Sequence, residues 1–157
     1  MIPKLVHLKT KTLIGMHTKM SLAENKTGML WSQFSPRIHE IQGRISEDKF
    51  SLQVYPPSYF QEFNPHSTFE KWAAVESADF KSVPTNMNAF TLHGGFYAVF
   101  HYVGNSSDSS IFNWIFSEWL PDSGHSLDDR PHFEVLGSKY KNNDPLSEEE
   151  IWIPIAY

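Results

Sequence analysis

Two stretches of the sequence place apolar residues at helical spacing, and segments typical of β-strands precede and follow each stretch. The first covers residues 30–45 in steps of three and four, with Pro36 inside, so this helix is expected to kink or to end early. The second covers residues 111–120, after Asp108 as a good N-cap residue, and is expected to end at Pro121. Two helices among many strands favour an α+β domain.

The segments expected to form strands are short runs in which apolar residues alternate with polar ones or occupy both faces. They cover residues 4–20, 50–55, 71–77, 89–93, 96–103, 132–136 and 151–155. Gly94 and Gly95 predict a hairpin turn between two of them, and Gly15 predicts a bulge or a close approach of another backbone. The order strand–helix–strand–strand occurs twice. This predicts a duplicated unit, a largely antiparallel sheet with the helices on one face, and a groove between the halves.

Composition excludes several classes of site and partner. The absence of cysteine excludes a disulfide scaffold, thiol catalysis and a cysteine zinc site, and it agrees with a cytoplasmic location. The net charge of −5 disfavours direct nucleic-acid binding, and no apolar run or leader segment points to a membrane. The eight histidines lack metal-ligand spacing, so no metal and no other cofactor is expected. At roughly 100–200 residues per domain, residues 1–157 are expected to form a single domain.

Aromatic residues are more numerous than a core of this size needs, with 12 Phe, 5 Trp and 6 Tyr. Because small-molecule pockets are walled by apolar and aromatic side chains, a few of them are expected to line a cavity. Trp31, Phe34 and Trp114 could project from the helices into the groove, with core packing as the favoured alternative. Tyr97 belongs to a strand that is apolar on both faces, so this strand is central in the sheet or borders a cavity.

Glu134 is the leading candidate for a functional charge, because it stands in mid-strand among apolar residues. Alternation favours a solvated face, and the alternative is a cavity in which the carboxylate would be protonated or would need a cation. Tyr55 shares a strand face with Ser51 and Gln53, so its hydroxyl could be solvated. The 59–69 segment is expected to be a loop that covers the groove or only decorates the surface.

Several segments together resemble the GyrI-like small-molecule-binding domains of AraC-type and MerR-type multidrug regulators and of the DNA gyrase inhibitor protein. The resemblance covers nearly the whole chain. It rests on residues 12–15, 30–34, 72–76, 95–104, 114–124, 131–135 and 149–155.

The resemblance implies a curved sheet of two strand–helix–strand–strand units with a central ligand groove. In the family, the glutamate that corresponds to Glu134 projects into this groove and meets lipophilic, often cationic, ligands. Leu136 stands where the family usually has an aromatic residue. Regulators of the family also carry a DNA-binding domain. Since 157 residues leave no room for one, a stand-alone module is expected.

Our main hypothesis is a binding protein for hydrophobic, cationic aromatic compounds. Glu134 is expected to supply the counter-charge, and the aromatic enclosure is expected to come from Trp31, Phe34, Tyr55, Tyr97 and Trp114. One alternative is a hydrolase of strained, electrophilic small molecules, with Glu134 as general base and Tyr55 or Tyr97 as proton donor. Another alternative is a modulator of a protein partner, such as a gyrase inhibitor. Homodimerisation through an edge strand is a further option.

Overall fold

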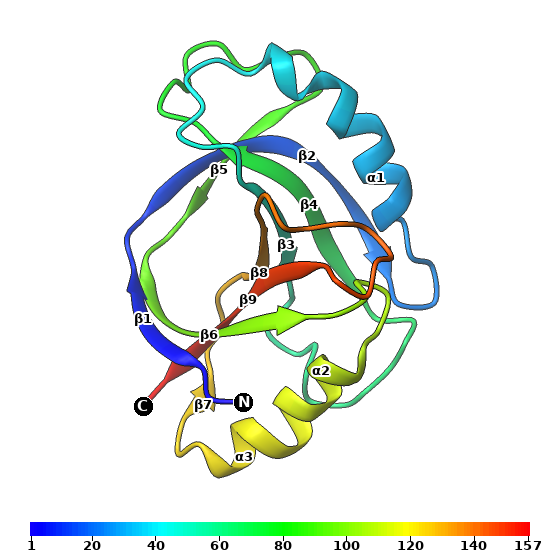
Figure 1. Cartoon of the computed structure of the whole chain (residues 1–157), viewed down its shortest axis with the longest axis vertical. Coiled ribbons are helices and arrows are strands. Elements are labelled where there is room, and N and C mark those ends of the chain that lie inside the picture. The colour runs from blue at the N-terminus through cyan, green and yellow to red at the C-terminus, as the bar shows by residue number, and fades with distance from the viewer.

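Nine antiparallel strands form one strongly curved sheet in the computed structural model, which describes all 157 residues (Figure 1). Along the sheet the order is β1-β6-β9-β8-β3-β4-β2-β5, and β7 pairs with β9. The strands are β1 Lys4–Leu8, β2 Lys11–Ser21, β3 Lys49–Val54, β4 Thr68–Glu76, β5 Asn88–Leu92, β6 Gly95–Val103, β7 Ser126–Leu127, β8 His132–Leu136 and β9 Glu148–Ala156.

Two helical regions pack on the outside of this sheet. The first consists of α1 (Thr27–Phe34) and the 3-10 helix η1 (Ser35–Glu40), and the second of α2 (Ser110–Trp114), the π-helical turn η2 (Ile115–Trp119) and α3 (Leu120–Asp122). Pro36 lies in the first turn of η1, so the α-helix ends just before it, as expected. None of these helices is long and apolar enough to cross a membrane.

The second helical region ends at Asp122, one residue after the expected end at Pro121. Pro121 lies in the first turn of α3, and the helix continues to Asp122. A proline clashes with the carbonyl four residues earlier in a regular α-helix. Here the wider turn η2 immediately precedes α3, which is how the helix accommodates the ring.

The expected hairpin at Gly94 and Gly95 is wrong. β5 pairs with β2 and β6 pairs with β1, so β5 and β6 do not pair with each other. Instead, Gly94 and Gly95 form a bend between β5 and β6, which run on as one long strand antiparallel to β1 and β2. At the bend, a Cβ on Gly94 would overlap the carbonyl oxygen of Leu8, and the Gly94 N–H donates to Thr10 Oγ1 at 2.9 Å. The paired strands β1 and β6 lie at one end of the strand order, and their continuations, β2 and β5, lie at the other end. This connection between the two ends curves the sheet into the ring seen in Figure 1.

The duplicated unit is confirmed by the sheet order. The first unit contains β2, α1, β3 and β4, and the second contains β6, the α2–α3 region, β8 and β9. In space the strands run β6-β9-β8 and then β3-β4-β2, so the units meet at β3 and β8 in mirrored order. The α+β class with a curved, antiparallel sheet and two main helices is therefore established.

Three buried clusters follow from the alternation of side chains along the strands. One fills the inside of the ring and includes Leu52, Trp72, Tyr97 and Phe133. The second lies between α1 and the outer face of β2 and β4, and the third lies between the α2–α3 region and the outer face of β6 and β9. The helices thus cover the two flanks of the outer face, and its middle, formed by β3 and β8, is left for the groove.

Candidate groove on the outer face of the sheet

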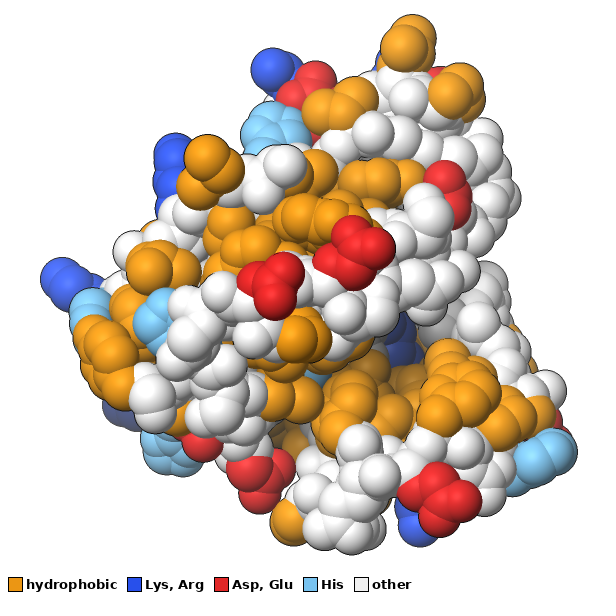
Figure 2. Space-filling model, turned by 90° about the horizontal axis from the view of Figure 1, so that it is seen from below, with side chains coloured by type: hydrophobic (Ala, Val, Ile, Leu, Met, Phe, Trp, Pro, Cys, Tyr) orange, Lys and Arg blue, Asp and Glu red, His pale blue; other side chains and the backbone are white.

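A groove of about 930 Å³ opens over the uncovered strands β3 and β8, a volume within the usual range for small-molecule sites. Figure 2 shows the molecule hollowed on one side, with hydrophobic side chains gathered around the opening. Thirteen of the 23 lining residues are hydrophobic. They come from strands near the centre of the sheet, from the start of the α1 region, from the α2–η2 region and from the loop after β3.

Cross-strand pairing sets the polar side chains of the groove floor in two rows. Gln53 on β3 pairs with Lys71 on β4 and with His132 on β8, which places these three on one face of the sheet. In the next row on that face, Glu134 pairs with Ser51 and with Ile151 on β9. The sheet therefore brings one carboxylate and one amine, from different repeats, to the same floor.

Glu134 lies half-buried in this floor rather than on a freely solvated face. Its Oε2 accepts a hydrogen bond of 3.2 Å from Gln53 Nε2. Burial raises the pKa of Glu134, and the positive charge of Lys71 and the bond from Gln53 oppose that rise. A carboxylate held in this way gains from any cation that enters the groove.

Lys71 is the second charge of the groove and was not among the residues predicted from the sequence to bind ligand. Only 5% of the residue is exposed, and no hydrogen bond or ion pair engages its Nζ. Burial lowers the pKa of the Lys71 amine, whereas Glu134 and Glu149 oppose the fall. A signal was present, because Lys71 shares a strand face with Phe69 and Ala73, which are both buried.

An aromatic wall closes one end of the groove. The ring of Tyr55 lies 4.5 Å from that of Tyr59, 4.8 Å from Phe60, 4.9 Å from Phe69 and 4.9 Å from His132, measured between centroids. The loop after β3 thus folds back against the groove instead of only decorating the surface.

Phe60 links this loop to the helical side of the groove. Its ring stacks on His132 at 5.3 Å and on Phe116 of η2 at 5.6 Å. No local sequence pattern predicts these contacts, because they join segments far apart in the chain.

Two ring side chains of the wall are held in their neutral forms. Burial lowers the pKa of His132 to about 3. Burial raises the pKa of Tyr55, and the charge of Glu134 adds to that rise. Beside the groove, burial and then Glu134 raise the pKa of Glu149 to about 7. The charge of the groove region near neutral pH therefore depends on Glu134, Lys71 and Glu149.

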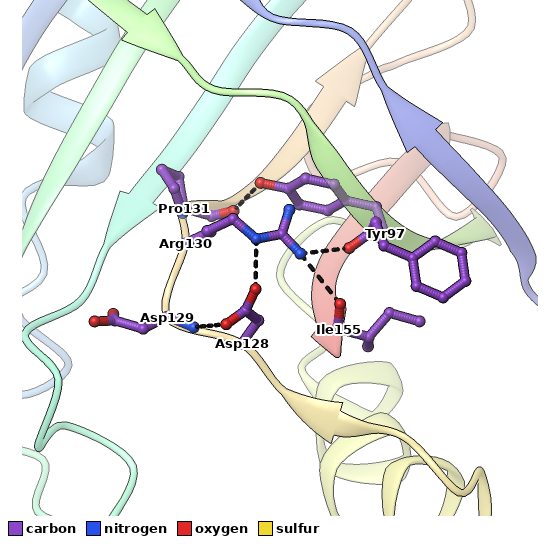
Figure 3. A network of polar contacts seen from close by, with 7 residues as sticks. Tyr97, Asp128, Asp129, Arg130, Pro131 and Ile155 are labelled. Carbon is purple, nitrogen blue, oxygen red and sulfur yellow. Dashed lines mark hydrogen bonds and ion pairs between the residues drawn. The ribbon is translucent and has the colours of Figure 1, made fainter. Parts of the chain in front are cut away.

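Of the six residues expected to bind ligand, Glu134 and Tyr55 line the groove and the other four do not. Tyr97 points into the ring, on the opposite face of the sheet, and is fully buried. Its hydroxyl donates to the Pro131 carbonyl at 2.8 Å, and the Arg130 guanidinium carbon lies 4.8 Å from the ring centroid (Figure 3). Arg130 in turn donates to Asp128 at 2.7 Å.

The three candidates from the helices pack toward the sheet flanks. Phe34 is fully buried in the cluster beneath α1, and Trp31 packs against the same cluster. Trp114 packs beneath the α2–α3 region, with its ring edge-on to Phe100 at 6.2 Å. These contacts are the core packing that the sequence analysis weighed as the alternative.

Residues 4–155 match the family described as "Integron-associated effector binding protein". The chain belongs to this family. The expected relationship to GyrI-like effector-binding domains is thereby confirmed, and so is the coarse function of the family, small-molecule effector binding.

Members and structural neighbours of this effector-binding family differ in length and sequence. The transcriptional regulator BrlR of Pseudomonas aeruginosa is 27% identical over 154 residues, which are 97% of this chain and 54% of BrlR. The chain thus spans about half the length of that regulator.

Two solved structures show the same fold at low sequence identity. SAV2435 bound to tetraphenylphosphonium has a TM-score of 0.70 at 18% identity, covering 99% of this chain and 94% of SAV2435. The integron cassette protein VCH_CASS2 from the mobile metagenome of Vibrio cholerae has a TM-score of 0.70 at 16% identity, covering 98% and 95% of the two chains.

Proposed function

We propose that the groove binds lipophilic, cationic aromatic compounds and that Glu134 is their counter-charge. The observation that carries the proposal is a carboxylate in the floor of a largely apolar groove, with the neutral amide of Gln53 as its hydrogen-bond partner. Ionising such a group is unfavourable until a cation lies beside it. The attraction between the ionised carboxylate and the cation would therefore supply part of the binding free energy. The tetraphenylphosphonium bound by SAV2435 is a ligand of this class.

The aromatic wall supports the same ligand class. Tyr55, Phe60 and Phe116 offer ring surfaces around the groove, and a cation near a ring face gains about 0.5–2 kcal/mol per contact. Phe63, at the groove and 81% exposed, adds apolar surface that a lipophilic ligand would cover. A bulky cation with aromatic substituents uses both the wall and the carboxylate.

The test is calorimetric titration of tetraphenylphosphonium, with triphenylphosphine oxide as a neutral aromatic control. We expect Glu134→Gln to weaken binding of the cation about tenfold or more, equivalent to at least ~1.4 kcal/mol, and to leave the neutral compound unaffected. Glu47→Gln is the matched control, because it removes the same charge from a side chain that is 98% exposed and outside the groove. Equal affinity of wild type and Glu134→Gln for the cation would refute the proposal.

A second candidate is hydrolysis of a strained electrophile, with Glu134 as general base and Tyr55 as proton donor. The observation in its favour is that both side chains line one groove, where burial keeps the Tyr55 hydroxyl protonated. Incubation with an aromatic epoxide separates the two functions. Turnover that disappears in both Glu134→Gln and Tyr55→Phe would establish the enzyme, and an unchanged epoxide would exclude this activity for that substrate.

A further inference from the structure

Lys71 is the one charged group lining the groove that the proposed function leaves unused. It is 95% buried, lines the groove, and has no hydrogen-bond or ion-pair partner at Nζ. Phe69 and Ala73, its neighbours on the same strand face, are buried as well and offer no polar atom from their side chains. The Lys71 stem is buried and its Nζ retains contact with the groove solvent, so an anionic partner brought by a ligand would replace water at an ammonium in a largely apolar site.

The nearby groups do not satisfy Lys71. Glu134 shares the floor with it, but the two form no ion pair, and the Glu134 carboxylate is engaged by Gln53. Glu149 on β9 influences Lys71 electrostatically and likewise forms no ion pair with it. His132 and Tyr55 face the same region in neutral form. The amine and the carboxylate therefore stand as two separate polar anchors on one apolar floor.

A ligand that carried only a positive charge would meet attraction from Glu134 and repulsion from Lys71. A ligand that also carried an anionic oxygen would satisfy both, because each of its charges would have a buried partner of opposite sign. The groove volume of about 930 Å³ leaves room for an aromatic body together with a short acidic arm.

We propose that Lys71 anchors an anionic oxygen and that the groove selects lipophilic zwitterions, which carry an aromatic cation and a carboxylate or similar acid on one molecule. This inference rests on the proposed function for its cationic half. Lys71 is in this view a specificity-determining residue, and the preferred ligand class is narrower than lipophilic cations in general.

The experiment titrates three compounds by calorimetry at pH 7.5. They are butyltriphenylphosphonium, (4-carboxybutyl)triphenylphosphonium and triphenylacetate, which carry the cation alone, both charges and the anion alone. The wild type should bind the carboxybutyl compound about tenfold or more tightly than the butyl compound. Lys71→Met should abolish that difference while still binding the butyl compound, and Lys139→Met, from a side chain that is 74% exposed, should preserve it.

The outcomes separate the two proposals. If the butyl compound binds through Glu134 and the carboxylate arm adds nothing, the role of Lys71 is overturned and the cation site stands. If neither phosphonium binds and triphenylacetate binds only when Lys71 is present, the cation site fails and the anion anchor stands. If none of the three binds, both fail. Thermal melting of each variant without ligand checks the fold, and Lys71→Met should melt no lower than wild type because it removes a buried charge.

Discussion

Glu134, Lys71 and Glu149 project from three different strands. Lys71 shifts the pKa of both carboxyl groups, and both carboxyl groups shift the pKa of Lys71. Their identities alone would suggest ordinary surface charges. Burial decides otherwise, since desolvation is the largest cause of the pKa shift for each of them. The charge state of the groove is therefore a property of its surroundings and responds to pH near neutrality.

Binding of a permanent lipophilic cation should strengthen as the pH rises from 5 to 8. Over this range Glu149, whose pKa is raised to about 7, loses its proton and becomes negative beside the groove. A negative Glu149 favours a cation in the groove, so binding of the cation should also release protons. Titration of tetraphenylphosphonium in two buffers of different ionisation enthalpy measures that release. Tighter binding at pH 5 than at pH 8 would contradict the assignment.

His132 should make the fold less stable in mild acid. Its pKa is about 3 in the folded protein and near 6.5 when unfolded, so the unfolded chain binds the extra proton as the pH falls between those values. At pH 5 this costs about 2 kcal/mol of unfolding free energy relative to pH 7.5. Glu149, whose pKa of about 7 is raised, acts in the opposite direction over the same range.

Comparison with His132→Phe isolates the effect, because phenylalanine keeps the stack between Phe60 and Phe116 without a titratable nitrogen. Urea unfolding at the two pH values should show wild type losing about 2 kcal/mol relative to this variant. His66→Gln, at an exposed loop position, should behave like wild type. The same pH dependence in His132→Phe and wild type would rule out the buried histidine as its source.

Among the elements, those with strong local signals were predictable. The bounds of β8 are as expected, and Pro36 ends α1 where a proline should. The bend at Gly94 and Gly95 was not predictable in the same way. Two strand segments around a Gly-Gly pair have the same sequence pattern whether they pair with each other or, as here, each pair with another strand. Glu134 was chosen as a candidate because it lies among apolar residues of one strand. The contacts of Phe60 with His132 and Phe116 depend on how the loop after β3 folds back, which no local sequence pattern predicts.

The glycines of β2 and α1 should respond oppositely to the same substitution. Gly15 holds regular pairing with Ala74 and has no bulge, and a Cβ there would overlap the Ala73 carbonyl oxygen and lie 2.7 Å from Ala74 Cα. Gly28 is exposed in α1 with nothing within 4 Å of a Cβ. Gly15→Ala should lose on the order of 2 kcal/mol or more of stability, whereas Gly28→Ala should gain about 0.5–1 kcal/mol. Thermal or urea unfolding decides, and a tolerated Gly15→Ala would contradict the close packing of β2 on β4.

For the whole molecule, the decisive feature is that the two repeats meet at β3 and β8. Lys71 belongs to the first repeat and Glu134 to the second, so the two anchors stand on opposite sides of this junction. A compound bound by both side chains would link the two repeats. Its binding free energy would add to the stabilisation that the pairing of β3 with β8 already gives the junction. Only a ligand that reaches both side chains would link the repeats in this way, so stiffening of the junction would depend on the two charges of the ligand.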